Sequence, residues 1–121
     1  MRISVLALAA TGFALMGLAA LAAPDRIVAP FGMRATTPAA ASEVRAVYGG
    51  FGIALAGVLA WAATGAGGAH TGAVLAAGIA LLGMAGGRLL SRLLDPGVPF
   101  YPVYFYLLVE LVSGAALCAV A

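Results

Sequence analysis

Hydrophobic residues fill four stretches of the chain, which short polar or Gly- and Pro-rich segments separate. The stretches cover residues 3–23, 38–63, 71–94 and 101–121. Each is long enough for an α-helix to cross a hydrocarbon core of about 30 Å. Because backbone groups inside lipid must satisfy their own hydrogen bonds, we expect these spans to be helices. The pattern predicts an all-α fold, an integral membrane four-helix bundle, as a single domain over residues 1–121.

Local signals sharpen the limits of these helices. Thr37 followed by Pro38 predicts a helix start, with Thr37 as the N-cap and Pro38 in the first turn. The turn-forming string DPG at 95–97 ends the third span near Leu94. Residues 24–37 are rich in Pro and Gly and also contain apolar side chains, so we expect them to form a loop on the membrane surface.

The first span has a second interpretation. Arg2, the apolar run after it and the small-residue site at 20–22 together resemble a secretory signal peptide that is cleaved. The apolar run is longer than the usual core of a signal peptide. We therefore favour an uncleaved first span.

Composition supports the membrane class and excludes several others. Hydrophobic residues make up 64% of the chain and charged residues 8%, whereas a soluble domain is about half apolar and a quarter charged. Six arginines against four acids, with no lysine, are too few for a nucleic-acid surface. A single cysteine, Cys118, excludes an intrachain disulfide. The lone His70 indicates no metal site, and no cofactor motif is present, so we expect no metal and no cofactor.

The arginines also predict an orientation. The loops at 24–37 and 91–100 lie on the same side of a four-span protein, and that side carries five of the six arginines. Arg2 is on the other side. The positive-inside rule places the arginine-rich loops in the cytoplasm, with both termini outside.

Charged residues inside the spans form the main candidate site. Counted from the arginine-rich helix ends, Glu43, Arg45, Arg88 and Glu110 all lie roughly 8 to 12 Å deep at 1.5 Å per residue. Tyr48 shares a helix face with Arg45. We therefore expect these five residues to form one buried polar layer that binds a ligand or holds the helices together.

Energetics single out one pair in this layer. A charge at mid-membrane costs about 2.5 to 3.5 kcal/mol on insertion scales. Arg88 is the best partner for Glu110, because it lies at matching depth on the preceding antiparallel helix and can hold a carboxylate with two hydrogen bonds. Two alternatives remain open: Glu43 and Arg45 as a pair that snorkels to the interface, and Glu110 in a purely structural ion pair.

Small residues beside these charges are expected to let the helices approach closely. Glycine permits such contacts because it has no side chain. The glycines expected at helix contacts are Gly49, Gly50, Gly52, Gly83, Gly87 and Gly114.

Three strings resemble a known family: EVRAVYGG at 43–50, GRLLS at 87–91 and LLVELVSG at 107–114. They are similar to small bacterial membrane proteins of the domain-of-unknown-function 4345 family, over almost the whole chain. The resemblance implies four membrane helices, a bacterial inner membrane and no established activity. A distant likeness to the DoxX-like group comes without the cysteine pair that redox chemistry of that kind would need. The matched positions are Glu43, Arg45, Tyr48, Gly49, Gly50, Gly87, Arg88 and Glu110.

These observations favour an uncharacterised multi-pass membrane protein that binds a lipid, a quinone-like ring or another small amphiphile, or assembles with a homo-oligomeric or membrane-protein partner. One alternative is a small proton-coupled transporter. Another is a membrane enzyme that uses Glu110 and Tyr48 as acid and base, although no nucleophile accompanies them. Overall an enzyme is the less favoured class, and no catalytic residue is assigned.

Overall fold

The computed structural model describes residues 1–121, and all of its regular elements are helices. Four helices are long and apolar enough to cross a membrane, at Arg2–Ala22, Pro38–Ala62, Gly68–Leu94 and Phe100–Val120. The second and fourth are composite, because a π-helical turn (η2 or η3) continues into the next α-helix. In chain order the elements are α1 (Arg2–Ala22), α2 (Pro24–Val28), η1 (Ala29–Phe31), α3 (Pro38–Val44), η2 (Arg45–Gly50), α4 (Phe51–Ala62), α5 (Gly68–Leu94), η3 (Phe100–Tyr104) and α6 (Phe105–Val120). The predicted fold class, an all-α protein with four membrane-length helices, is confirmed.

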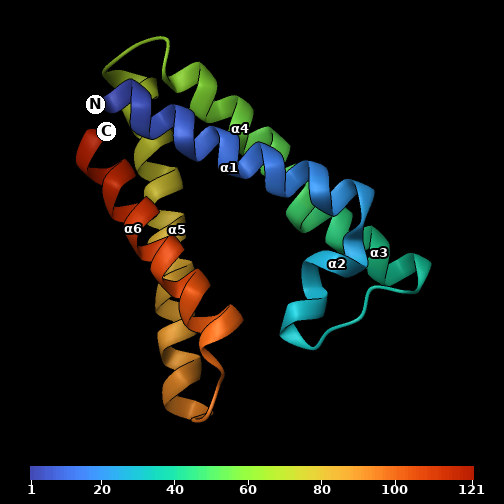
Figure 1. The fold of residues 1–121 in the computed structure, drawn as a ribbon. Coiled ribbons are helices and arrows are strands. Elements are labelled where there is room, and N and C mark those ends of the chain that lie inside the picture. The colour runs from blue at the N-terminus through green and yellow to red at the C-terminus, as the bar shows by residue number, and fades with distance from the viewer.

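The four spans form two antiparallel pairs that diverge like the arms of a V (Figure 1). In the first arm α1 packs along η2 and α4, and in the second arm α5 packs along α6. The arms meet at the end that holds both chain termini, where α4 contacts α5 and α1 contacts α6. Near the other end η1 contacts η3, so the arms touch again there.

A hydrophobic core fills the end where the arms meet. It takes buried side chains from all four spans: Leu6, Leu59, Ala62, Val74, Ala77, Leu81 and Leu117. A second and smaller core lies within the first arm, where Val28 and Ala35 of the loop region pack with Ala20 and Val44. The loop region is therefore bound to the first arm by apolar contacts.

Glycines set the distance between the helices inside each arm. A Cβ on Gly17 of α1 would lie 2.9 Å from the Gly49 oxygen, and one on Gly52 would lie 3.2 Å from the Cα of Gly17. In the second arm, a Cβ on Gly114 would lie 2.8 Å from the Gly78 oxygen. Backbones can approach this closely only where no side chain intervenes. Gly49, Gly52 and Gly114 thus lie at helix contacts, as expected, together with Gly17 and Gly78.

Three of the expected packing glycines lie elsewhere: Gly50, Gly83 and Gly87. A Cβ on Gly83 or Gly87 would meet nothing within 4 Å, and one on Gly50 would meet the Arg45 oxygen of its own helix at 3.8 Å. The prediction for these residues is corrected, because α5 turns the face of Gly78 toward α6. Residues five and nine positions further on lie on other faces of the same helix.

At each end of the first arm, an arginine side chain donates hydrogen bonds to the backbone of the neighbouring helix. Arg2, at the start of α1, donates to the carbonyl oxygens of Ala62 and Gly65 at 3.1 and 2.8 Å, where α4 ends. Arg45 donates from Nε to the Leu21 oxygen at 3.0 Å, where α1 ends. The last carbonyls of a helix lack partners within the helix, and a cation there also suits the helix dipole. Each helix of this arm thus supplies an arginine that caps the other.

The loop at 24–37 is more ordered than expected, because it contains the short helices α2 and η1. Asp25 organises it by accepting a hydrogen bond from the Ala35 amide at 2.7 Å and pairing with Arg34 at 3.5 Å. The helix start after it follows the prediction, since the Thr37 side chain accepts from the Ala40 amide at 3.1 Å and Pro38 stands in the first turn. The loop is thereby held in a defined position.

Candidate functional site

An ion pair joins the two helices of the second arm. Arg88 of α5 donates from Nε to Oε2 of Glu110 and from Nη2 to Oε1, both at 2.8 Å. The side chain of Glu110 is 6% exposed, and that of Arg88 is 24% exposed. Two parallel hydrogen bonds are the strongest form of arginine–carboxylate contact. The contact expected between these two residues is therefore present, and it compensates a charge in the middle of a span.

Aromatic rings cover the guanidinium of Arg88. Its Cζ atom lies 5.5 Å from the ring centroid of Phe31 and 5.7 Å from that of Tyr106. The two rings also contact each other, with centroids 5.6 Å apart. Cations are attracted to the faces of aromatic rings at such distances. Because Phe31 belongs to η1 of the first arm, this cluster connects the loop to the second arm.

A second arginine–tyrosine contact lies one helical turn further along α5. Arg92 donates from Nε to the hydroxyl of Tyr104. Arg88 and Arg92 stand four residues apart, which places them on one face of the helix. Both arginines of the second arm therefore contact a tyrosine of the fourth span.

The expected five-residue layer is split between the arms. Glu43 and Arg45 are exposed at the protein surface and lie on the first arm, whereas Arg88 and Glu110 pair within the second. The prediction of one common layer is wrong for Glu43 and Arg45, because the arms diverge toward this end (Figure 1). Equal depth along each helix does not bring such residues together. Tyr48 is half-buried and faces the second arm.

The stretch EVRAVYGG contains a local irregularity, since Arg45–Gly50 forms a π-helical turn. A π turn takes in one more residue than an α turn and shifts the faces of the helix after it; such turns are frequent at functional sites. Here Gly49 is buried against Leu21 of α1, and its neighbour Tyr48 lines the space between the arms. In this turn, Gly49 therefore packs against α1 while its neighbour Tyr48 lines the candidate site.

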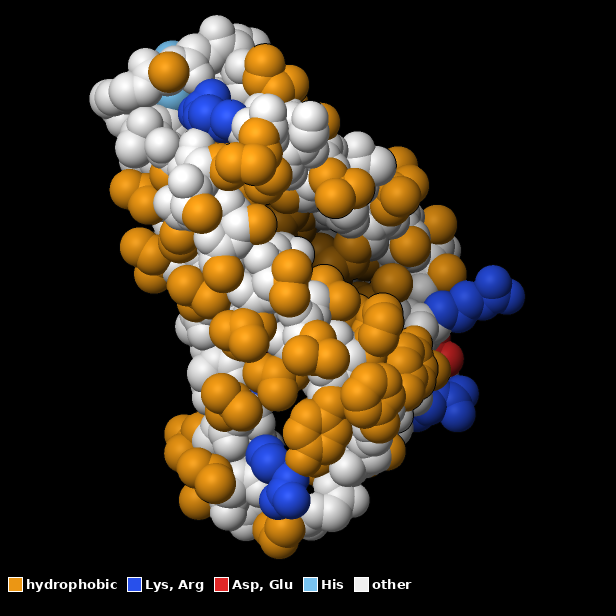
Figure 2. Space-filling model, turned by 60° about the vertical axis from the view of Figure 1, so that its left-hand side comes forward, with side chains coloured by type: hydrophobic (Ala, Val, Ile, Leu, Met, Phe, Trp, Pro, Cys, Tyr) orange, Lys and Arg blue, Asp and Glu red, His pale blue; other side chains and the backbone are white.

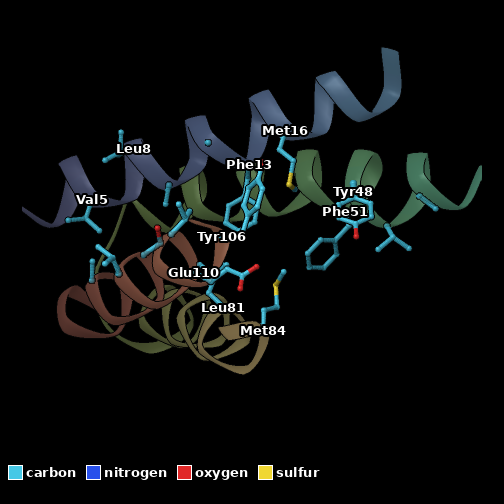
Figure 3. Close-up of a pocket in the computed structure, with 18 residues that line it drawn as sticks. Val5, Leu8, Phe13, Met16, Tyr48, Phe51, Leu81, Met84, Tyr106 and Glu110 are labelled. Carbon is cyan, nitrogen blue, oxygen red and sulfur yellow. The ribbon is translucent and has the colours of Figure 1, made fainter. Parts of the chain in front are cut away.

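A cleft of about 770 Å³ lies between the two arms. All four spans line it, and 15 of its 18 lining residues are hydrophobic. Figure 2 shows it as a hollow on one face of the molecule, lined by hydrophobic side chains. In Figure 3, Tyr48 and Phe51 point into it from one wall, and Met84 and Glu110 from the other. Its volume falls in the range of sites for single small molecules, about 300 to 1,000 Å³.

Few polar residues line this cleft. The polar atoms come from Glu110, Ser113 and the hydroxyls of Tyr48 and Tyr106, whose rings are counted among the 15 hydrophobic residues. Arg88 is not in the lining, since it lies behind Glu110. The cleft therefore combines an apolar body with a small polar wall on the second arm, which is the usual composition of a ligand site.

Sequence reasoning missed several residues that surround the ion pair and the cleft. Phe31 is one of several apolar residues in the loop at 24–37, and nothing in the sequence around it indicates a contact with Arg88. Phe13 and Met16 line the cleft from α1, but the first span has no charged residue after Arg2 that would mark one face. Nor does the structure hold a group of three His, Cys, Asp or Glu side chains placed to bind a metal.

The fold and the site define a class: a small membrane protein of four spans with an ion pair in one arm and an apolar cleft between the arms. The model of a family described as Domain of unknown function (DUF4345) matches residues 2–121. The chain belongs to this family. Comparisons with curated proteins and with solved structures found no match.

Proposed function

We propose that this protein binds a lipid or another small amphiphile in the cleft between its arms. The observation that carries the proposal is the composition of the cleft, an apolar space of about 770 Å³ with Glu110 in its wall. Lining residues such as Leu8, Met84 and Val112 are exposed and lie well inside their spans. The opening would face the hydrocarbon of a bilayer, so an amphiphile could enter from the side.

The state of Glu110 supports binding over proton-coupled transport. Both of its oxygens are held by Arg88 at 2.8 Å. A carboxylate that couples proton movement to transport must exchange its partner during each cycle. Breaking a bidentate, ring-covered contact at each turn would oppose such a cycle.

We further propose that the protein lies in a bacterial inner membrane with the loops at 24–37 and 91–100 in the cytoplasm. Five arginines at that end against Arg2 at the other support this orientation. Cysteine substitutions at Ala66 and at Gly97 test it in a Cys118→Ala background. A membrane-impermeant maleimide should label the cysteine at 66 in intact cells and the one at 97 only after permeabilisation. The opposite pattern would refute the orientation.

Two matched glycine variants test the binding proposal. Gly12 lines the cleft, whereas Gly57 does not, and a Cβ at either position would meet nothing within 4 Å. Both lie on exposed faces of membrane helices. Gly12→Phe should therefore place a ring inside the cleft, and Gly57→Phe should add the same ring outside it.

Native mass spectrometry of the purified protein reports molecules that remain bound after extraction from the membrane. We expect the wild type and Gly57→Phe to retain a bound amphiphile and Gly12→Phe to lose it. Equal retention in Gly12→Phe would place the ligand outside the cleft. A wild type that retains none, and takes up none when amphiphiles are added, would reject the function.

A further inference from the structure

Only the negative partner of the ion pair between Arg88 and Glu110 faces the cleft. Glu110 lines the cleft, but Arg88 does not. The guanidinium of Arg88 is occupied by the carboxylate on one side and lies against the rings of Phe31 and Tyr106. A ligand inside the cleft therefore meets the carboxylate first, and the positive charge is already compensated.

This arrangement is unfavourable for either kind of ionic head group. An anion would approach the carboxylate of Glu110 without gaining a free cation. A cation would have to compete with Arg88, which holds both carboxylate oxygens at 2.8 Å. A charge that enters an apolar cleft without a partner costs far more than a neutral polar group does.

Neutral hydrogen-bond donors fit the same wall. An ionised carboxylate has about four lone-pair positions, and Arg88 fills two of them in the structure. The remaining positions can accept from a hydroxyl, which is a partner that an apolar ligand cannot provide. Tyr48 and Ser113 also line the cleft and can donate to or accept from the same group.

We propose that the ligand is a neutral amphiphile with a free hydroxyl group, which donates a hydrogen bond to Glu110 while its apolar part fills the cleft. This inference rests on the proposed binding function and narrows it to one chemical class. It includes alcohols such as diacylglycerols and hydroquinones with an apolar tail, and it disfavours anionic phospholipids.

A matched series of lipids tests the class. Dioleoylglycerol has a free hydroxyl, its acetyl ester has none, and dioleoyl phosphatidic acid carries an anionic phosphate on the same two chains. The full-length protein in detergent is titrated with each lipid and analysed by native mass spectrometry. We expect the free alcohol to bind about tenfold more tightly than either of the others, since one hydrogen bond to a charged group accounts for that ratio.

Three outcomes separate this inference from the proposed function. If all three lipids bind equally and Gly12→Phe abolishes binding of all three, the cleft binds amphiphiles but the hydroxyl class is wrong. If phosphatidic acid binds most tightly in the wild type, the class is also wrong. If Gly12→Phe leaves binding of the alcohol unchanged, the binding function itself fails.

A charge-swapped variant provides a second and more direct test. Arg88→Glu combined with Glu110→Arg keeps an ion pair between α5 and α6 and places the guanidinium in the cleft wall. We expect the swapped protein to lose its preference for the alcohol over the acetyl ester, because a guanidinium donates hydrogen bonds and cannot accept one from a hydroxyl. An unchanged preference in a folded swap would contradict the assigned role of Glu110.

Ser113→Ala covers the case in which the swapped protein does not fold. This change removes one hydroxyl from the cleft wall and leaves the ion pair in place. Binding of dioleoylglycerol should weaken by about two- to tenfold, and binding of its acetyl ester should change less. Equal effects on both lipids would argue against hydrogen bonding at this wall.

Discussion

Arg45 and Arg88 begin as similar residues and end in different roles. Each stands a few turns inside a long apolar span, near the same end of the molecule. Arg45 caps the end of α1 through the Leu21 oxygen at 3.0 Å, whereas Arg88 holds both oxygens of a buried carboxylate. The difference comes from the neighbouring helix. The neighbour of Arg45 ends beside it and offers a free carbonyl, whereas the neighbour of Arg88 continues past it and presents Glu110.

The comparison shows that depth in a span does not decide how a charge is compensated. A backbone carbonyl at a helix end and a carboxylate in a helix centre can both satisfy an arginine. They differ in the group that loses its partner when the arginine is removed. This group is a neutral carbonyl beside Arg45 and a buried carboxylate beside Arg88. Four measurements test this contrast, from the largest expected effect to the smallest.

Removal of the two arginines should give the largest difference. Arg88→Leu leaves Glu110 buried without a partner and should lower the free energy of unfolding by about 3 to 5 kcal/mol. Arg45→Leu removes one hydrogen bond to a carbonyl at an exposed site and should cost about 1 kcal/mol. Equilibrium unfolding in mixed micelles measures both values. Equal losses would show that the two arginines are not compensated in different ways.

Double substitution should show the coupling within the buried pair. Arg88→Leu with Glu110→Leu should be more stable than the two single losses predict, by about 0.5 to 3 kcal/mol. The matched cycle on Glu43 and Arg45 should be additive within about 0.5 kcal/mol, because these residues make no mutual contact. The same unfolding assay applies to both cycles. Coupling of similar size in the two cycles would mean that Glu43 belongs to a network after all.

The helix spacing that permits the buried pair can be tested through glycines. Gly114→Ala places a Cβ 2.8 Å from the Gly78 oxygen, one turn from Glu110, and should cost about 1 to 3 kcal/mol through overpacking. Gly87→Ala has open space around it and should be neutral or stabilising by up to about 1 kcal/mol. Thermal unfolding ranks the two variants. A loss at Gly87 as large as at Gly114 would indicate a contact that the fold does not contain.

The ring that covers Arg88 should give the smallest effect. Phe31→Leu keeps an apolar side chain and removes one cation–π contact, which should cost about 0.5 to 2 kcal/mol. Met33→Leu, in the same loop and exposed, should change stability by less than about 0.5 kcal/mol. The pair is measured in the same detergent. If Phe31→Leu is as neutral as the control, the loop does not stabilise the ion pair.

Local sequence signals predicted the helices well. Thr37 and Pro38 mark the start of the second span because capping depends on residues close in sequence, and the DPG turn ends α5 at Leu94 as expected. The contact between Arg88 and Glu110 could also be predicted from the sequence. Their two helices are neighbours in the chain, and short connections make such helices antiparallel partners. Glu43 and Arg45 were misplaced because their neighbour is α1, whose end point the charge pattern does not reveal.

The sequence by itself determined that the chain forms four membrane-length helices, that the second begins at Pro38 and the third ends at Leu94, and that Glu110 requires a partner inside its span. These properties follow from hydropathy, capping and the cost of a buried charge, which act locally. The tertiary structure decided that the helices form two arms and that Phe31 covers Arg88. It also decided that Tyr48 and Glu110 face one cleft from opposite walls. Those features depend on the angle between the arms, which arises from a core shared by all four spans and from the contact between η1 and η3. Residues distant in sequence set both.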